Sequence, residues 1–295
     1  MATVSCGTSS ERFRFIDENR EQFGVKYMCA YFGVSRSGYY AWRSRKKPNR
    51  AYANEALLWR IEKIHMASRE TYGSPRVHAA LRKRGLRVGR TRVERLMREA
   101  GIKARTARIY RRLAGLHRFY DRIRNRRLDG PAPSAINQQW AADLTYLRVG
   151  RSWRYLAVVI DLYSRRIVGW SMGAQRTVQL TGAALMMAIR RRRPAPGLLF
   201  HTDRGIEYRS YAIQDIHKRY GIEPSMNRPG KCTDNAEVES FFHTLKGETV
   251  RGREWKCERE LRQNVAGYIQ HFYNRTRLHS SLGYCSPVEY EAMRA

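Results

Sequence analysis

The sequence predicts a chain of two parts, a basic helical part followed by an α/β domain with a mixed sheet. Two observations predict this division. Residues 1–135 show helical apolar spacing interrupted by glycine and proline, whereas residues 136–295 open with three segments rich in β-branched and aromatic side chains. Charge divides in the same place, because the first part holds 32 of the 57 basic residues and 11 of the 26 acidic ones. A length of 295 residues allows several domains and a sizeable core.

The net charge of +31 indicates a polyanionic partner. Such an excess of one sign repels itself in a compact chain unless a partner neutralises it, and nucleic acid does so through its phosphates. Arginine outnumbers lysine, which suits bidentate contacts with phosphates and base edges. The general arginine bias of a protein from a GC-rich genome is the alternative explanation of the composition.

Other features of the composition exclude several classes of protein. No run of 18 apolar residues is present, so no membrane span is expected, and the first residues lack the basic and then apolar plan of a signal peptide. The five cysteines are odd in number and form no C-x-x-C pair, which argues against a disulfide scaffold or a zinc ribbon. A cytoplasmic protein that associates with the nucleoid is therefore expected.

The first helical pair is predicted over residues 21–45, within an N-terminal region of residues 1–50. Gly33 lies in the turn between the two helices, and Ser35 is placed to cap the second helix by accepting from free backbone N–H groups. This is the outline of a helix-turn-helix that contacts DNA through Arg36. A small helical hairpin that binds nothing has the same pattern, so both interpretations remain open.

A second helix-turn-helix is predicted over residues 51–110. Its first helix is long and has one apolar face, and the next two helices each end at a glycine. The three helices are expected at residues 53–68, 75–84 and 90–100. The last one is apolar on one side and is predicted to expose Arg90, Arg92, Arg95 and Arg98. That basic face predicts DNA contact, against the alternative of a solvated face on a helical spacer.

Residues 111–135 are interpreted as a basic linker, and the residue pattern changes from helical to strand-like after them. Three strands follow in succession, and strands then alternate with helices. The strands are expected at 139–149, 152–163, 165–172, 197–203 and 222–227, and the helices at 177–192, 209–220 and 234–248. This is the element order of an RNase H-like fold with a mixed five-stranded sheet. The domain is expected over residues 136–295, with outer helices near 258–273 and 287–293.

The helix expected at residues 234–248 concentrates acidic side chains. Its apolar stripe consists of Val238, Phe241, Phe242 and Leu245. Along one edge of that stripe lie Asn235, Glu239 and Lys246. Either Thr233 or Asp234 is placed to cap its start. An amphipathic helix with scattered surface acids is the plain interpretation, and it gives none of the acids a role.

Two acids in the strands favour a chemical role. Asp143 interrupts the first strand, and Asp203 follows a buried strand at its carboxyl end, where the ligands of open α/β sheets gather. In an RNase H-like topology these strands are neighbours and the helix with Glu239 packs across their ends, so the three carboxylates are expected to converge. Oxygen ligands without His or Cys suit Mg²⁺ or Mn²⁺, and two such ions serve in-line displacement at phosphorus. The three acids are therefore predicted to be catalytic and to bind metal.

Other polar residues have plainer interpretations. Asp161 precedes a hairpin turn and is expected to cap it, and Asp234 is expected to cap its helix. Glu207 and Glu237 have no pattern that supports a role. His201 is expected to be packed or to contact phosphate, not to bind metal.

Together these residues resemble a known signature. Asp143, Asp203 and Glu239 have 59 and then 35 intervening residues and precede Lys246, which is similar to the D-D-35-E pattern of retroviral integrases and related transposases. Further segments resemble the frame-B transposase of the IS-three insertion-sequence family, from about residue 12 to residue 292. These are GVSRSGYYAW, YGSPRVHAALRKRG, WAADLTYL, VVIDLYSRRIVGW, HTDRGIEY, DNAEVESFFHTLKGE and YNRTRLHSSLGYCSPVEY.

The resemblance implies a DDE transposase with an integrase catalytic core. Such an enzyme cleaves at the inverted-repeat ends of its element and joins the freed 3′-hydroxyl to a phosphodiester, usually after a circular intermediate. The resemblance places two Mg²⁺ or Mn²⁺ ions at Asp143, Asp203 and Glu239, and gives Lys246 a contact with the DNA end. Further substrate contacts are expected at Arg204, Asn235 and Arg275.

The same resemblance implies partners. These are the element ends and the target DNA, other copies of the chain in a homo-oligomer on DNA, and the upstream frame-A product, either separate or fused. Two other functions remain open from the sequence. A metal-dependent nuclease would cleave DNA without joining it, and a non-catalytic DNA-binding regulator would use the helix-turn-helix units alone. A retroviral-type integrase is disfavoured because no His-His-Cys-Cys zinc module precedes the core.

Overall fold

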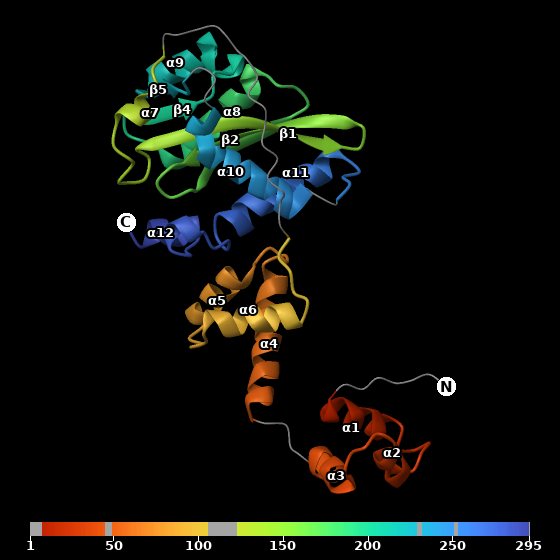
Figure 1. Ribbon diagram of the computed structural model, residues 1–295. Helices are drawn as coiled ribbons and strands as arrows, with labels where there is room; N and C mark the ends of the chain where they lie inside the picture. Colours follow the sequence, from red (N-terminus) through yellow and green to blue (C-terminus); the bar gives the residue numbers. More distant parts are fainter. Residues whose placement is uncertain (1–7, 45–48, 106–122, 229–231, 251–252, 295) are drawn as a thin grey trace. The chain divides into compact units, whose positions relative to one another are not determined.

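The chain forms two compact units, residues 1–60 and residues 61–295. The structure is a computed structural model that describes residues 8–44, 49–105, 123–228, 232–250 and 253–294 (Figure 1). The described part of the first unit is helical, whereas the second contains helices and one sheet (Figure 1). Residues 111–122 of the predicted linker lie outside the described residues.

In the first unit, the helices α1 (Ser9–Glu18), α2 (Val25–Tyr31) and α3 (Arg36–Ser44) pack around a small core. The unit also includes the start of α4 (Asn49–Ala67), which takes no part in that core. The core helices begin with α1. The first of them was not predicted; it begins at a capping box between Thr8 and Glu11. The core consists of Ile16, Met28, Cys29 and Tyr39.

The predicted first helical pair is confirmed as α2 and α3. The turn between them contains Gly33 with a φ of +63°, a left-handed conformation that glycine adopts without steric cost. Ser35 caps α3 as predicted, because its Oγ accepts a hydrogen bond of 3.0 Å from the Gly38 N–H. Arg36 is exposed at the start of this helix.

The predicted second helix-turn-helix begins the second unit. Its helices are the remainder of α4, then α5 (Ser74–Lys83) and α6 (Arg90–Glu99). The apolar faces of these helices are buried, as predicted, and within the second unit they consist of Ile61, Ile64, Val93, Leu96 and Met97. The predicted exposure of the basic face is wrong in part, since Arg92 and Arg95 are half-buried and Arg95 pairs with Glu99 at 2.9 Å. An (i, i+4) neighbour of opposite charge draws Arg95 along the helix surface.

The sheet has five strands in the order β3-β2-β1-β4-β5. These are β1 (Gln139–Val149), β2 (Ser152–Asp161), β3 (Ile167–Gly173), β4 (Leu199–Thr202) and β5 (Glu223–Met226). The first three pair in antiparallel fashion, whereas β4 pairs in parallel with both β1 and β5. The sheet is therefore mixed, as predicted, and β1 is its middle strand.

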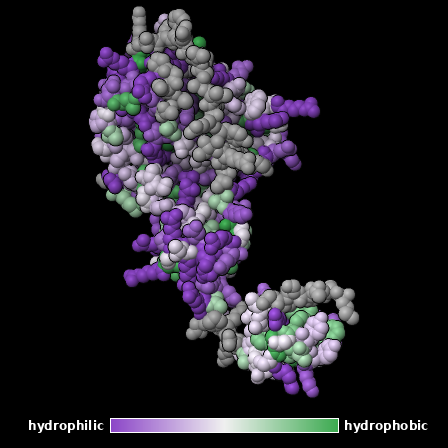
Figure 2. All heavy atoms as spheres, in the orientation of Figure 1, coloured by the Kyte–Doolittle hydropathy of each residue, from purple (hydrophilic) through white to green (hydrophobic). Residues whose placement is uncertain are grey.

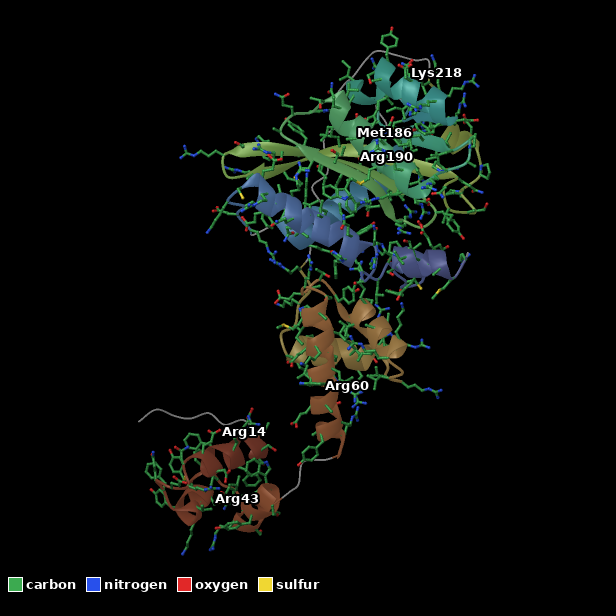
Figure 3. The ribbon with its side chains drawn as sticks, turned by 180° about the vertical axis from the view of Figure 1, so that it is seen from behind. Arg14, Arg43, Arg60, Met186, Arg190 and Lys218 are labelled. Carbon is green, nitrogen blue, oxygen red and sulfur yellow. The ribbon has the colours of Figure 1, made fainter. Side chains whose placement is uncertain are left out.

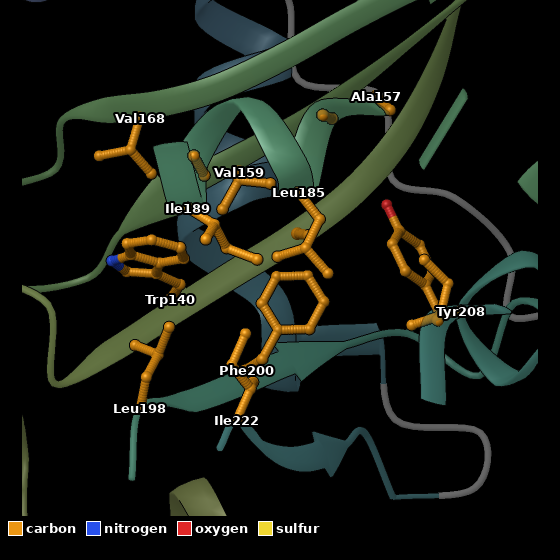
Figure 4. Packing of buried hydrophobic residues seen from close by; sticks show 14 of the residues in the cluster. Trp140, Ala157, Val159, Val168, Leu185, Ile189, Leu198, Phe200, Tyr208 and Ile222 are labelled. Atoms are coloured by element: carbon orange, nitrogen blue, oxygen red, sulfur yellow. The ribbon is translucent and has the colours of Figure 1, made fainter. Parts of the chain in front are cut away.

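One face of the sheet packs on α8 (Val178–Arg192), and this contact forms the main core of the unit (Figure 4). Trp140 and Phe200 are fully buried there among aliphatic side chains. Gly169 of β3 allows the helix to come close, because a Cβ at that position would lie 2.1 Å from the Ala184 carbonyl oxygen. Next to α8 lies α9 (Tyr211–Tyr220), which buries Ile213 against the same core.

The other side of the sheet is covered by α10 (Ala236–Leu245), whose predicted apolar stripe is buried (Figure 1). It continues as a π-helical segment, η3 (Lys246–Val250). Behind it lie α11 (Glu258–Gly267) and a second π-helical segment, η4 (Tyr268–Tyr273). Phe241 packs edge-on against Tyr273 with ring centroids 4.8 Å apart. Short helices α7 (Arg126–Asp129) and α12 (Pro287–Ala292) complete the described elements of the domain.

Candidate active site

The two strand acids lie side by side. Asp143 stands in β1 opposite Val158 of β2. On its other side β1 pairs in parallel with β4, with Ala142 opposite Thr202. Continuing that register by one residue places Asp203 beside Asp143, at the separation of neighbouring strands, about 5 Å.

The charges around the two acids agree with this placement. Burial raises the pKa of the Tyr208 hydroxyl far above its usual range, and Asp143 and Asp203 raise it further. Burial lowers the pKa of the Arg176 guanidinium, but neighbouring carboxylates reverse that shift and leave the pKa raised. Those carboxylates belong to Glu207, Asp203 and Asp143. Both aspartates therefore act on the same tyrosine and the same arginine, which requires that they lie close together.

Asp203 is half-buried, and its charge is only partly compensated. Burial raises the pKa of Asp203, and the Glu207 carboxylate adds to the rise. The Gly205 N–H, which donates to Asp203 Oδ1 at 3.0 Å, and the Arg176 guanidinium act in the opposite direction. The ionised form of Asp203 is therefore disfavoured in the protein alone. A bound cation stabilises such a carboxylate most effectively.

Sequence reasoning missed three residues that surround the aspartates, namely Arg176, Glu207 and Tyr208. Glu207 is buried in the short helix η1 (Ile206–Arg209) and pairs with Arg176 at 2.5 Å. Within the described residues the buried Tyr208 hydroxyl has no hydrogen-bond partner. Helical or strand periodicity says nothing about a single 3₁₀ turn, so no pattern in the sequence singled out Glu207.

Gly205 makes the close approach of these acids possible. A Cβ at this position would lie 2.8 Å from Asp203 Oδ1 and 3.0 Å from Glu207 Oε2. Both distances are shorter than ordinary van der Waals contact, so any side chain here would displace one of the two carboxylates. A glycine two residues after Asp203 was the available signal for this arrangement.

Glu239 stands on α10, which approaches the same strand. At the start of that helix the Asn235 side chain donates to the Ala142 carbonyl at 3.0 Å, next to Asp143. Glu239 lies one turn further along α10 and is exposed. Among the described residues, no three His, Cys, Asp or Glu side chains are gathered closely enough to hold a metal ion. The fold pairs the two aspartates and holds Glu239 on the adjoining helix.

The residues expected to contact substrate differ in their surroundings. Lys246 is half-buried, with its Nζ 4.7 Å from the centre of the Tyr146 ring. Arg204 donates from Nε to the Asn227 carbonyl at 2.7 Å and from Nη2 to the Ile123 carbonyl at 3.2 Å. Asn235 is buried. Arg204 and Asn235 therefore support the backbone near the site in this structure.

Arg275 is exposed and lines a cavity of about 510 Å³ away from the paired aspartates. The other polar residues of its wall are Arg166, Arg191, Arg192, Gln270, His271 and Asn274. Four arginines thus line the cavity, and Glu291 pairs with two of them, Arg166 and Arg192. Basic side chains are also exposed elsewhere, for example Arg190 of α8 and Lys218 of α9 (Figure 3), and hydrophilic residues cover much of the visible surface (Figure 2).

Two of the plainer interpretations are confirmed. Asp161 is fully buried and accepts from the backbone N–H groups of Tyr163 and Ser164, so it caps the hairpin turn as predicted. His201 is buried and hydrogen-bonds to Ser225 at 2.9 Å and to Asn227 at 2.7 Å. Burial lowers the pKa of His201 to about 4, so the ring is packed in its neutral form.

The prediction that Asp234 caps α10 is wrong. Asn235 occupies the N-cap position, whereas Asp234 accepts hydrogen bonds from Arg228 and from Asn125 at 2.8 Å. The hydrogen bond from Arg228 lowers the pKa of Asp234 to about 2. Long-range partners have displaced the local cap. The alternative cap, Thr233, has a side chain outside the described part of the chain.

Family models match three parts of the chain. An integrase core domain model matches residues 133–232, and a second integrase core domain model matches residues 220–287. An HTH-like domain model matches residues 52–110. The class defined by the sheet, its paired aspartates and these matches is therefore that of proteins with an integrase core behind a helical domain.

Relatives of known name narrow the class. The chain is 37% identical over 284 residues to transposase InsF for insertion sequence IS3A of Escherichia coli, covering 95% of this chain and 98% of that protein. It is 40% identical over 263 residues to the insertion element IS600 31 kDa protein of Shigella sonnei, covering 89% and 97%. The chain belongs to the IS3 family of insertion-sequence transposases. Among solved structures, the HTLV-2 integrase catalytic core domain in complex with magnesium aligns with a TM-score of 0.42 and 17% identity, over 54% of this chain and 98% of that one.

Proposed function

We propose that this chain binds the inverted-repeat ends of an insertion sequence and catalyses metal-dependent DNA cleavage and strand transfer. In strand transfer a 3′-hydroxyl attacks a phosphodiester of the target. The observation that carries the proposal is the pair Asp143 and Asp203 next to the carboxyl end of β4, with α10, which carries Glu239, held against the neighbouring strand β1. Ligands of open α/β sheets bind at that end of the strands. The names of the transposase relatives support the same activity.

The chemistry of the donor atoms at this place suits a divalent metal. Asp143, Asp203 and Glu239 offer only oxygen donors, which suit two Mg²⁺ or Mn²⁺ ions. The raised pKa of Asp203, caused by burial, agrees with a carboxylate that a cation would stabilise. When bound, such ions activate an attacking oxygen and stabilise the leaving one in an in-line displacement.

Side chains next to the aspartates would orient the DNA. Glu207 forms an ion pair with Arg176, whose side chain is 47% exposed beside the acidic pair. An arginine fixed in this way offers bidentate donors to a non-bridging phosphate oxygen and offsets the repulsion between phosphate and carboxylates. Lys246, beside Tyr146, would contact the DNA end at the far end of α10.

The helical parts of the chain would bind the DNA. We assign residues 1–50 and 51–110 to two DNA-binding domains, residues 111–135 to a basic linker and residues 136–295 to the catalytic core. Arg36 of α3 and Arg90 of α6 are exposed at the starts of their helices, which suits contact with phosphates or base edges. Arg92 and Arg95 would add positive charge to the same face of α6. The cavity lined by Arg275 would bind a further phosphate.

Assembly on DNA follows from the reaction. Because two element ends must be joined to one target, we propose that the chain acts as a homo-oligomer on DNA, alone or with the upstream frame-A product. Within the described residues, no helix has the length and apolar character needed to cross a membrane. We propose that the protein acts in the cytoplasm, at the nucleoid where its DNA lies.

A strand-transfer assay tests the proposal. The purified chain is incubated with labelled inverted-repeat ends, target DNA and Mg²⁺ or Mn²⁺, beside Glu239→Gln and the matched control Glu254→Gln. Glu254 is exposed and also loses its charge in the control. We expect joined product from the wild type and from the control, and none from Glu239→Gln, although the latter binds the ends within about twofold of the wild type.

Other outcomes distinguish the alternatives. Cleavage without joining would support a metal-dependent nuclease. Tight binding without any reaction would support a DNA-binding regulator, unless addition of the frame-A product restores joining. If Glu239→Gln lost binding in proportion to activity, Glu239 would hold the fold together and would not serve the chemistry.

A further inference from the structure

A buried ion pair lies just beyond the helix that carries Glu239. Glu248, in the π-helical segment η3, accepts from Arg277 Nε at 3.1 Å and Nη2 at 2.9 Å, and from the Tyr268 hydroxyl at 2.6 Å. Glu248 and Arg277 are both buried, with exposures of 7% and 6%. A carboxylate that receives two donors from one guanidinium has its position fixed in two directions. Arg277 therefore fixes the C-terminal end of the α10–η3 helix.

The backbone on both sides of Arg277 is held by the second helix-turn-helix. The Tyr72 hydroxyl donates to the Thr276 carbonyl at 3.1 Å and accepts from the Leu278 N–H at 2.9 Å. Arg76 Nε donates to the Leu278 carbonyl at 3.0 Å. Tyr72 is 4% exposed, and it precedes the first turn of α5. A single tyrosine oxygen thus clamps the two residues that flank the buried arginine.

These contacts join the DNA-binding helices to the catalytic helix in one path. The path runs from the α4–α5 turn through Tyr72 to residues 276–278, through Arg277 to Glu248, and along α10 to Glu239. Beside it lies a cavity of about 440 Å³, lined by Arg76 from α5 and by His243, Thr244 and Gly247 from α10 and η3. The hydrogen bonds of the path therefore connect the two parts of the unit that line this cavity.

We propose that Tyr72 and Arg277 are positioning residues for catalysis: the helix-turn-helix formed by α4, α5 and α6, seated on residues 276–278, sets the position of Glu239 relative to the paired aspartates. This inference rests on the proposed function. It makes metal binding and cleavage depend on the seating of a DNA-binding domain. The same domain carries the proposed DNA contacts of α6. If it were displaced from residues 276–278, Glu239 would lose its position relative to Asp143 and Asp203.

The test compares two tyrosine hydroxyls in the full-length chain. Tyr72→Phe removes the clamp and keeps the ring. Tyr39→Phe is the matched control, because Tyr39 is also buried and its hydroxyl donates to Asp17 at 2.8 Å in the first unit. We measure end binding, the single-turnover cleavage rate at saturating DNA, and the Mg²⁺ concentration that gives half the maximal rate.

We expect Tyr72→Phe to lower the cleavage rate about tenfold and to raise the half-maximal Mg²⁺ concentration several-fold, with end binding within twofold of the wild type. Tyr39→Phe should leave the cleavage rate and the metal dependence unchanged. Arg277→Lys keeps the charge and loses the paired donors, so it should act in the same direction, and the double variant should be no slower than the slower single one. Wild-type rate and metal dependence in Tyr72→Phe would overturn the proposal, as would additive effects of the two substitutions.

A second measurement does not need an active enzyme. Hydrogen exchange of the α10 amides, residues 236–245, should be faster in Tyr72→Phe than in the wild type and unchanged in Tyr39→Phe. Equal exchange in all three proteins would overturn the inference even if no strand transfer were detected. A wild type that stays inactive even with the frame-A product, together with faster exchange in Tyr72→Phe, would instead overturn the proposed function and leave the positioning path standing.

Discussion

The two helix-turn-helix pairs of this protein share the same outline and differ in the contacts that hold them in place. In the first unit, α2 and α3 pack with α1, and the Tyr39 hydroxyl bonds to Asp17, 22 residues away. In the second unit, Tyr72 bonds to a carbonyl 204 residues away, and Lys83 pairs with Glu289 at 2.8 Å. The comparison teaches that one helical outline occurs in two settings, in a compact unit of its own and in a domain built into the unit that carries the paired aspartates.

The largest expected effect tests whether the two units are independent. Glu248→Ala leaves the buried Arg277 charge unpaired, which should destabilise the second unit by about 3–5 kcal/mol. Scanning calorimetry should show the transition of the second unit moved to lower temperature and that of the first unit unchanged. Glu18→Ala, at an exposed position of α1, is the control and should move neither transition. Equal shifts of both transitions would mean that the units fold as one.

A pH titration sharpens the same comparison, because the first unit contains no histidine. Burial lowers the pKa of His201 and of His217 to about 4, and that of His279 to about 3. In the unfolded chain the pKa returns to about 6.5, so unfolding takes up protons between that value and the lowered one. The second unit should therefore lose stability as the pH falls from 6.5 to 4, by about 3 kcal/mol for each buried ring, while the first unit shows no such loss.

His217→Leu isolates one of these rings. His217 packs edge-on against Phe200 with ring centroids 5.4 Å apart, and among the described residues its Nε2 has no hydrogen-bond partner. The substitution should flatten the fall in stability over this pH range, measured by chemical denaturation, and His271→Leu at an exposed position should not. An unchanged slope in His217→Leu would mean that the ring is not held neutral.

The smallest effect concerns DNA contact by each pair. Arg36→Ala in the first pair and Arg90→Ala in the second should each lower the slope of log affinity against log salt by about 1, because each removes one phosphate contact. The change should come without loss of thermal stability, since both side chains are exposed. Arg14→Ala, also at an exposed position, is the control. A slope altered by only one of the two substitutions would assign DNA binding to that pair alone.

Helix faces and local caps were accessible from the sequence because both depend on near neighbours along the chain. The stripe Val238, Phe241, Phe242 and Leu245 is buried as its spacing predicts, and Ser35 caps α3. Prediction failed where a distant partner competed with a local one. Asp234 does not cap α10, because it accepts a charge-assisted hydrogen bond from Arg228 and a buried one from Asn125 instead.

The sequence by itself determined the order of strands and helices, the apolar faces, and the spacing of Asp143, Asp203 and Glu239. The RNase H-like topology also predicted that the strands of the two aspartates are neighbours. Only the tertiary structure decided the register that sets Asp203 beside Asp143, the place of Glu207 and Arg176 next to them, and the contact of Tyr72 with the backbone around Arg277. The physical reason is the separation along the chain over which each interaction acts. Periodicity and capping are set within a few residues, whereas strand register and buried ion pairs depend on which distant segments the folded core brings into contact.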